Sequence, residues 1–155
     1  MIDEALLLRA GLLAWKDADR LADRRALSKA FRDNWDRRIG KARFGGVWSI
    51  SLAKGNLLHP ASEAALAIPR KEWKNGVVTV EHAVPIAVLF PKFMAADTEE
   101  KMQEVVSAYN VAVVTHQENL ALKKLGLQKA MPKDWEWGHS PTLRWELAGI
   151  SVILA

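Results

Sequence analysis

The stretch from Glu81 to Asn119 holds the side chains whose types and spacing suggest a chemistry. Glu81 and His82 are adjacent, Asn110 follows 28 residues after the histidine, and Asn119 comes nine residues later. An imidazole changes its charge near neutral pH and can take a proton from water. Carboxylate and carboxamide oxygens are ligands for hard divalent cations. These side chains have the types needed for metal-assisted acid–base chemistry, provided that the fold brings them together.

Two short strands are predicted on either side of a long connection. The β-branched residues 77–80 follow an Asn-Gly turn signal and predict a strand that ends near His82. Pro85 lacks a backbone donor and favours extended geometry before it, so we expect His82 on an irregular or edge segment rather than in a helix. A second apolar run, residues 111–114, predicts a strand that pairs antiparallel with the first.

A helix is predicted directly after the second strand. Thr115 and Glu118 fit a capping box, in which the hydroxyl and the carboxylate each bind the other residue's backbone amide. Gly126 is a natural residue for the helix end. Asn119 then lies near the first turn of this helix, close to where the strands hold the acidic residue and the histidine. We expect polar side chains from three elements to converge.

The order and spacing of Glu81, His82, Asn110 and Asn119 resemble the HNH nucleases of the His-Me finger superfamily. The words EHAVPI and NVAVVTHQENLALKK are similar to the start of that motif and to its segment from Asn to helix. The resemblance covers about the middle third of the chain. It implies an α+β fold with a ββα-metal core at 77–126, and a helical insertion at 91–109 that accounts for a gap longer than is usual in the family. Glu stands where Asp or His is commoner, which preserves a carboxylate.

The resemblance also implies a role for each residue in phosphodiester hydrolysis. His82 would be the general base, and Asn110 would tie the connecting loop and help to orient it. Glu81 and Asn119 would bind a single divalent cation, Mg²⁺ or Mn²⁺, which stabilises charge on the phosphate. His116 is either an extra ligand or phosphate contact, or an exposed residue of the first helical turn. Hydrolysis would leave a 5′ phosphate and a 3′ hydroxyl, with DNA as the expected substrate.

Basic residues that could contact a nucleic-acid backbone concentrate in the first third of the chain. Residues 16–43 hold ten Lys or Arg against five Asp, within a formal net charge of +4. Lysine and arginine contacts to phosphates supply most non-specific affinity for nucleic acid. The candidate contacts are Arg20, Arg24, Lys41 and Arg43, together with Lys123 and Lys124 near the end of the motif helix. A solvated face with local ion pairs is an equally good interpretation of the N-terminal set.

Length and composition predict one ordinary domain, residues 1–155. Half of the residues are hydrophobic and a quarter are charged, which is typical of a globular chain. The absence of cysteine excludes disulfides and zinc knuckles, and fits a reducing cytoplasm. No apolar run approaches the length that spans a membrane.

The remaining elements are predicted to surround the core. A helical arm at 1–40 has Asp17 or Asp19 as a second N-cap and Gly40 as its end. Residues 47–52 alternate as a half-buried strand, and residues 62–68 suggest a short helix. The C-terminal part, 127–155, is expected to form a helix from Ser140 to Gly149 and a terminal strand. Its Trp residues are expected to pack in or beside the core.

Two other classes of protein remain open. A non-catalytic nucleic-acid-binding module could keep the fold and lack the metal, although it would have no need for Glu81, His82 and Asn119 together. A regulatory protein could use its Trp-rich C-terminal part as a contact surface, although it would have no need for the basic segment. The oligomeric state is also open, because one subunit would nick DNA whereas a homodimer would break both strands.

Overall fold

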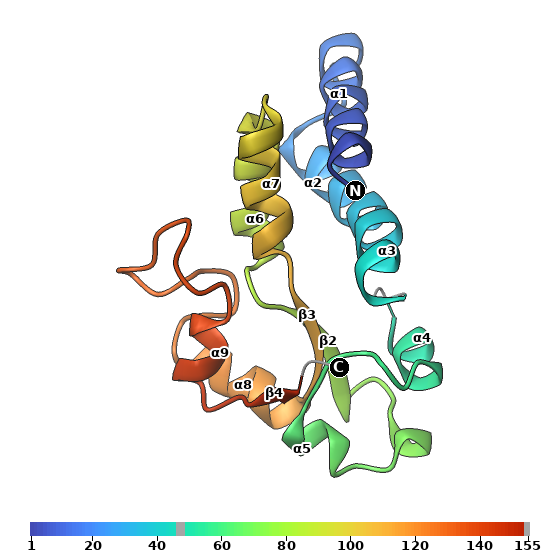
Figure 1. The fold of residues 1–155 in the computed structure, drawn as a ribbon, viewed down its shortest axis with the longest axis vertical. Coiled ribbons are helices and arrows are strands. Elements are labelled where there is room, and N and C mark those ends of the chain that lie inside the picture. The colour runs from blue at the N-terminus through green and yellow to red at the C-terminus, as the bar shows by residue number, and fades with distance from the viewer. Residues whose placement is uncertain (46–48, 154–155) are drawn as a thin grey trace.

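The computed structural model describes residues 1–45 and 49–153 as an α+β fold with a four-stranded mixed sheet. The strands are β1 (Ala61–Ser62), β2 (Val78–His82), β3 (Val111–Thr115) and β4 (Val152–Ile153). Their order in the sheet is β2-β3-β1-β4, with β1 parallel to β3 and the other two pairs antiparallel. Figure 1 shows the long helices above this sheet and shorter helices around its lower end.

The N-terminal arm is helical almost throughout. Helix α1 (Ile2–Ala18) is followed by α2 (Arg24–Trp35), a π-helical segment η1 (Asp36–Gly40) and α3 (Lys41–Phe44). The second N-cap is Asp23, whose carboxylate accepts from the Ala26 amide, so the prediction of Asp17 or Asp19 is wrong. The prediction that Gly40 ends the arm is also wrong. Gly45, with a φ of 77°, takes the left-handed conformation that ends the helix.

The predicted order of strand, long connection, strand and helix is confirmed. Strands β2 and β3 pair antiparallel over five residues each, and β3 leads directly into α8 (His116–Lys124). Both hydrogen bonds of the Thr115–Glu118 capping box are present. The Glu118 carboxylate also accepts from the Ser62 hydroxyl, which ties the start of α8 to β1. Gly126 follows with a φ of 71°.

The long connection contains two helices rather than the one predicted at 91–109. They are α6 (Ile86–Ala95) and α7 (Glu99–Ala108). The first begins at the residue after Pro85 and continues through Pro91, and the second is capped by Thr98. Aliphatic and aromatic residues of both helices face the same core, which favours a helical hairpin over a single helix.

The predicted strand at 47–52 is wrong from residue 50 onwards, and residues 46–48 lie outside the described part. Residues Ile50–Gly55 form α4 instead, because the Ser49 hydroxyl caps the helix by accepting from the Leu52 amide. The short helix α5 (Glu63–Leu66) confirms the prediction at 62–68, and a single 3-10 turn, η2 (Arg70–Glu72), follows it. Near the C-terminus, α9 (Leu143–Leu147) is shorter than predicted, and β4 pairs with β1 as a terminal strand.

The core has separate parts on the two sides of the β2–β3 pair. The larger part joins α1, α2, α6 and α7, with Phe31, Trp35 and Phe93 in mutual aromatic contact and Tyr109 against Trp35. A smaller part joins β3, α8 and α9 around Ala112, Leu122 and Trp145. No helix of residues 1–45 and 49–153 has the length and apolar character required to cross a membrane.

Candidate active site

The last two residues of β2 point to opposite sides of the sheet. Glu81 is paired with Ala112 of β3, and His82 with Val111. Ala112 belongs to the small core beside α8 and α9, whereas Val111 belongs to the large core beneath α1 and α2. Because side chains on a strand alternate between faces, the two polar residues enter different layers of the protein.

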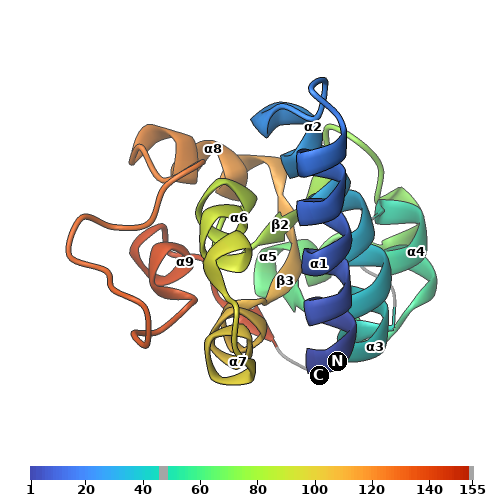
Figure 2. The ribbon, with the colours of Figure 1, turned by 90° about the horizontal axis from the view of Figure 1, so that it is seen from above.

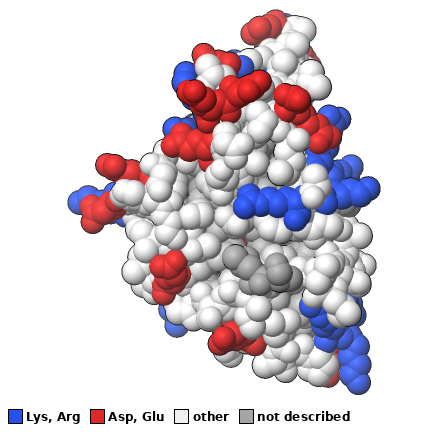
Figure 3. Space-filling view, in the orientation of Figure 1, with Lys and Arg blue, Asp and Glu red and all other residues white. Residues whose placement is uncertain are grey.

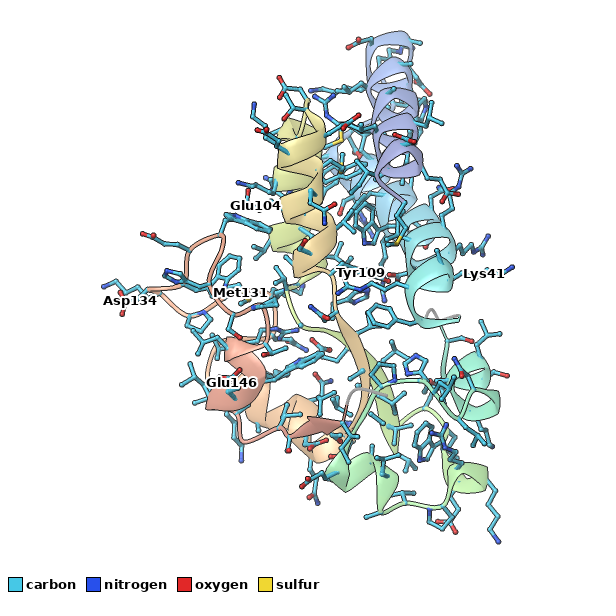
Figure 4. The ribbon with its side chains drawn as sticks, viewed as in Figure 1. Lys41, Glu104, Tyr109, Met131, Asp134 and Glu146 are labelled. Carbon is cyan, nitrogen blue, oxygen red and sulfur yellow. The ribbon has the colours of Figure 1, made fainter. Side chains whose placement is uncertain are left out.

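On the side of the large core, His82 belongs to a buried polar cluster. Its Nε2 lies 2.8 Å from Oδ1 of Asp36, the first residue of the π-helical segment after α2. The hydroxyl of Tyr109 donates to the same oxygen at 2.7 Å. Asp36 is 4% exposed, His82 8% and Tyr109 0%. Figure 4 shows Tyr109 where the helical layer meets the sheet, below the end of α7.

The donor and acceptor roles in this cluster follow from its burial. Burial is the main cause that raises the pKa of Tyr109 far above its ordinary value, and the neighbouring Asp36 charge raises it further. The phenol therefore keeps its proton and donates a hydrogen bond to Asp36. An ionised carboxylate can only accept, so the hydrogen between Asp36 and His82 is assigned to Nε2.

On the side of the small core, Glu81 belongs to a cluster centred on Arg144 of α9. The Arg144 side chain is fully buried and forms an ion pair with the Glu81 carboxylate. Its guanidinium also donates to the backbone carbonyls of His82, Ala83 (2.7 Å) and Leu127 (2.6 Å). The buried charge is thus paired and hydrogen-bonded on several sides, as burial of a charge requires.

A groove of about 740 Å³ opens at the same end of β2. Its lining includes both Glu81 and His82, and also Pro85. One wall is α2, and the residues that follow α8, Gln128 and Lys129, also line it. Figure 2 shows α2 and α8 on either side of β2. Residues far apart in sequence therefore meet around the histidine.

The groove is strongly basic. It is lined by five cations, Arg24, Arg25, Lys29, Arg32 and Lys129, against the single carboxylate of Glu81. Lys29 forms an exposed ion pair with Asp33 of its own helix. Positions 25, 29 and 32 repeat at helical spacing, so their side chains share one side of α2. The arrangement can hold a polyanion along α2 and across the end of β2.

The predicted nucleic-acid contacts divide between this groove and other surfaces. Arg24 lines the groove, whereas Arg20 is exposed in the turn between α1 and α2. Lys123 and Lys124 are exposed at the end of α8. Figure 4 shows Lys41 pointing outwards from α3. In Figure 3, Lys and Arg form a band at the level of α3, whereas acidic side chains gather above it.

Arg43 has a structural use of its own. Its guanidinium donates to the backbone carbonyls of Val106 and Tyr109 at 2.7 Å each, and so joins α3 to the end of α7. Burial against these groups lowers the pKa of Arg43. The guanidinium that the sequence suggests as a nucleic-acid contact therefore binds backbone carbonyls at the end of α7.

The two asparagines do not reach the groove. Asn110 lines a second groove with Arg43, Phe44 and Asn56, and its backbone carbonyl accepts from the Ala83 amide at 2.7 Å. This backbone bond ties the segment after His82 to β3. Asn119 is partly buried on α8, three residues before the buried Leu122, and therefore on the side of the helix that faces the sheet.

The chemistry of two of these residues fits a hard divalent cation. Glu81 and Asn119 provide oxygen donors and lie on the same side of the sheet, and Mg²⁺ is commonly held by few protein ligands and several waters. Arg144 occupies one oxygen of Glu81, the atom Oε1. In the described part of the chain, no three His, Asp or Glu side chains come together as a metal-binding group. His116 is exposed at the first position of α8.

Sequence reasoning missed Asp36, Tyr109 and Arg144. Asp36 lies 46 positions from His82, and Arg144 lies 63 positions from Glu81. One signal was available: Asp36 comes directly after a buried Trp on the apolar side of α2, where an unpaired carboxylate would be costly. Arg144 has a similar signal, because it stands beside the apolar Leu143 and Trp145 near the C-terminus.

A scan against models of protein families, a search among curated proteins and a search among solved structures each found no match. The function of this chain is therefore inferred from the geometry of the groove and its polar clusters.

Proposed function

We propose that this protein is a metal-dependent endonuclease of the HNH type that hydrolyses phosphodiester bonds, with DNA as its substrate. The observation that carries the proposal is the position of His82, whose Nε2 is held by a buried carboxylate while the residue lines a groove with five cations. A strand end with a histidine, a second antiparallel strand and a capped helix follow in the order of a ββα-metal core.

His82 is the general base of this reaction. With the hydrogen on Nε2, the lone pair of Nδ1 takes a proton from a water molecule, and the water oxygen forms a bond to phosphorus. The bond from phosphorus to the 3′ oxygen breaks, and that oxygen takes a proton from solvent. The products are a 5′ phosphate and a 3′ hydroxyl.

The cations of the groove bind the substrate and orient it. Arg25 and Arg32 hold phosphates beside α2, and Lys129 approaches from the other end of the groove. Glu81, which lines the groove, is the residue that would hold the divalent cation, with water as further ligands, and the cation would supply stabilisation of charge on the phosphate and on the leaving oxygen. Asn119 does not reach the groove and has no part in this site. Arg144 keeps the Glu81 carboxylate at the strand end.

Cleavage of supercoiled plasmid tests the activity. Purified protein is incubated with plasmid in Mg²⁺, Mn²⁺ or EDTA, beside His82→Ala and the matched control His139→Ala, which removes an exposed histidine outside the groove. We expect nicking that needs metal, persists in the control and disappears in His82→Ala. Cleavage that His82→Ala retains would overturn the assignment of the base.

Binding at different salt concentrations tests the groove separately from catalysis. Arg25→Ala/Arg32→Ala removes two groove cations, and Lys71→Ala/Lys133→Ala removes two exposed cations elsewhere, so both variants lose the same charge. We expect only the first variant to reduce the magnitude of the slope of log K against log salt, by about two. Each phosphate contact that is lost means that fewer counterions are released when the protein binds DNA. Equal slopes in both variants would place the bound DNA elsewhere.

A non-catalytic nucleic-acid-binding module is the second candidate. The ion pair between Glu81 and Arg144 favours it, because a buried guanidinium already neutralises the carboxylate that a metal would need. In this case the plasmid is bound in a salt-sensitive way, Arg25→Ala/Arg32→Ala weakens binding, and no metal supports cleavage.

A further inference from the structure

We propose that Asp36 is a positioning residue for His82: it holds the hydrogen on Nε2 of the imidazole and so directs the basic Nδ1 towards the groove. This inference rests on the proposed function. It goes beyond that function, because it assigns the orientation of the base to a carboxylate of the N-terminal arm rather than to Asn110.

One oxygen of the Asp36 carboxylate contacts two other side chains. Oδ1 of Asp36 is 2.8 Å from His82 Nε2 and 2.7 Å from the Tyr109 hydroxyl. These contacts come from three separate elements, namely the segment after α2, the end of β2 and the end of α7. The π-helical segment that begins at Asp36 is continuous with α2, so the carboxylate is attached to the helix that forms the basic wall.

Both hydrogen bonds of this cluster are accepted by Asp36. Tyr109 is fully buried and remains a phenol, so it donates to Asp36 and leaves the carboxylate as acceptor towards the imidazole. The other ring nitrogen, Nδ1, has no hydrogen bond to any of residues 1–45 and 49–153, and His82 lines the groove. A neutral imidazole with its hydrogen on Nε2 has its lone pair on Nδ1.

The proposed reaction places a positive charge on His82. When Nδ1 takes a proton, His82 becomes an imidazolium with the Asp36 carboxylate 2.8 Å from Nε2. A buried carboxylate at this distance stabilises the positive charge and also keeps the ring from rotating. Asp36 does not touch the substrate and acts only through His82.

Two variants with the same number and branching of side-chain heavy atoms separate this role from packing. Asp36→Asn keeps an oxygen that can accept from Nε2 but loses the charge, and Asp36→Leu has no acceptor. We expect kcat to fall about tenfold in Asp36→Asn and about 100-fold in Asp36→Leu, with KM for plasmid changed less than about twofold. Asp134→Asn, an exposed carboxylate outside the groove, is the matched control.

An NMR measurement on the free protein decides the positioning independently of cleavage. In wild type, a ring hydrogen of His82 is expected on Nε2, protected from exchange with water and shifted downfield by Asp36. The signal persists in Asp36→Asn and is lost in Asp36→Leu. A protected hydrogen on Nδ1, or none on either nitrogen, would overturn the proposal even if the protein cleaves DNA.

The kinetic outcomes are equally decisive. Unchanged kcat in both Asp36 variants would overturn the role, whatever the NMR signal. If wild type binds DNA but does not cleave it, the proposed function fails, and the catalytic role of Asp36 fails with it. The protected Nε2 hydrogen would then still report the hydrogen bond between His82 and Asp36. If Asp36→Leu does not fold, the wild-type spectrum and the kcat of Asp36→Asn remain as tests.

Discussion

Glu81 and His82 are neighbours in sequence, but their side chains enter two polar clusters of opposite character. The Glu81 cluster is centred on a fully buried Arg144, which binds one carboxylate and three backbone carbonyls. The His82 cluster is formed with Asp36 and Tyr109 beside a basic groove. The guanidinium of the first cluster is fully engaged by groups of the fold, whereas Nδ1 of His82 in the second has no hydrogen-bond partner among residues 1–45 and 49–153.

The comparison suggests how this fold combines stability with a site. Arg144 joins the end of β2 to the segment after α8, and so holds the strand end on which His82 is placed. Asp36 then orients the imidazole from the opposite side. We expect substitutions to lower the free energy of unfolding most at Arg144 and least at the groove cations. Four variants measure these losses.

The largest loss is expected for Arg144→Met. Removal of the guanidinium leaves the Glu81 carboxylate and three carbonyls without their buried partner, which costs about 3–5 kcal/mol of unfolding free energy. Urea denaturation measures the loss. Arg43→Met is the control, because the Arg43 guanidinium also donates to two backbone carbonyls but Arg43 is an exposed residue. Equal losses in the two variants would remove the distinction between the buried and exposed arginines.

A smaller loss is expected for Glu81→Gln. The amide keeps the shape and can accept from Arg144, but the charge-assisted bond is lost, at a cost of about 1.5–3 kcal/mol. The same variant should lose binding of Mn²⁺ in calorimetry if Glu81 also holds the cation. A variant with full Mn²⁺ affinity would restrict Glu81 to its bond with Arg144.

Tyr109→Phe tests the His82 cluster by removing the hydrogen bond from Tyr109 to Asp36. Loss of one hydrogen bond costs about 1 kcal/mol at neutral pH. Tyr109 is the only tyrosine, and its folded pKa is raised, so its contribution is complete below the unfolded pKa near 10. Above about pH 10 only the unfolded chain releases this proton, and wild type loses about 1.4 kcal/mol per pH unit.

Two measurements check the behaviour of Tyr109. The difference in unfolding free energy between wild type and Tyr109→Phe should fall to zero and change sign within about one pH unit above pH 10. Absorbance near 295 nm should show no tyrosinate in folded wild type until the protein unfolds. Reversible ionisation at pH 10 in the folded state would contradict the buried phenol and its donation to Asp36.

The smallest effect on stability is expected for Arg25→Ala/Arg32→Ala. Both side chains are exposed on α2, so the free energy of unfolding should change by less than about 0.5 kcal/mol. Thermal unfolding measures this, next to the DNA-binding experiment on the same variant. A large loss of stability would show that the groove cations support the fold and would weaken their assignment to substrate.

Local signals account for the parts of the fold that the sequence predicted. Val111–Thr115 and its capping box lie within one short stretch, so β3 and the start of α8 could be recognised from neighbouring residues. The failures occurred where two local signals compete. Residues 50–52 alternate like a strand, but the Ser49 cap and the burial of Ala53 favour a helix.

The site was predicted only as far as adjacent residues reveal it. Glu81 and His82 stand together at a predicted strand end, and Arg24 belongs to a visible basic segment. Arg43 looked equally suited to nucleic acid, but its guanidinium binds carbonyls of α7 and the residue after it. Whether a cation faces solvent or a backbone carbonyl depends on packing between distant elements.

By itself, the sequence determined the order of strand, helical connection, strand and capped helix, because hydrophobic period and capping are properties of neighbouring residues. Only the tertiary structure decided that Asp36 meets His82 and that Arg144 meets Glu81. These pairs form because a buried charge must find a partner in the folded chain, and that partner is selected by distance in space rather than along the sequence.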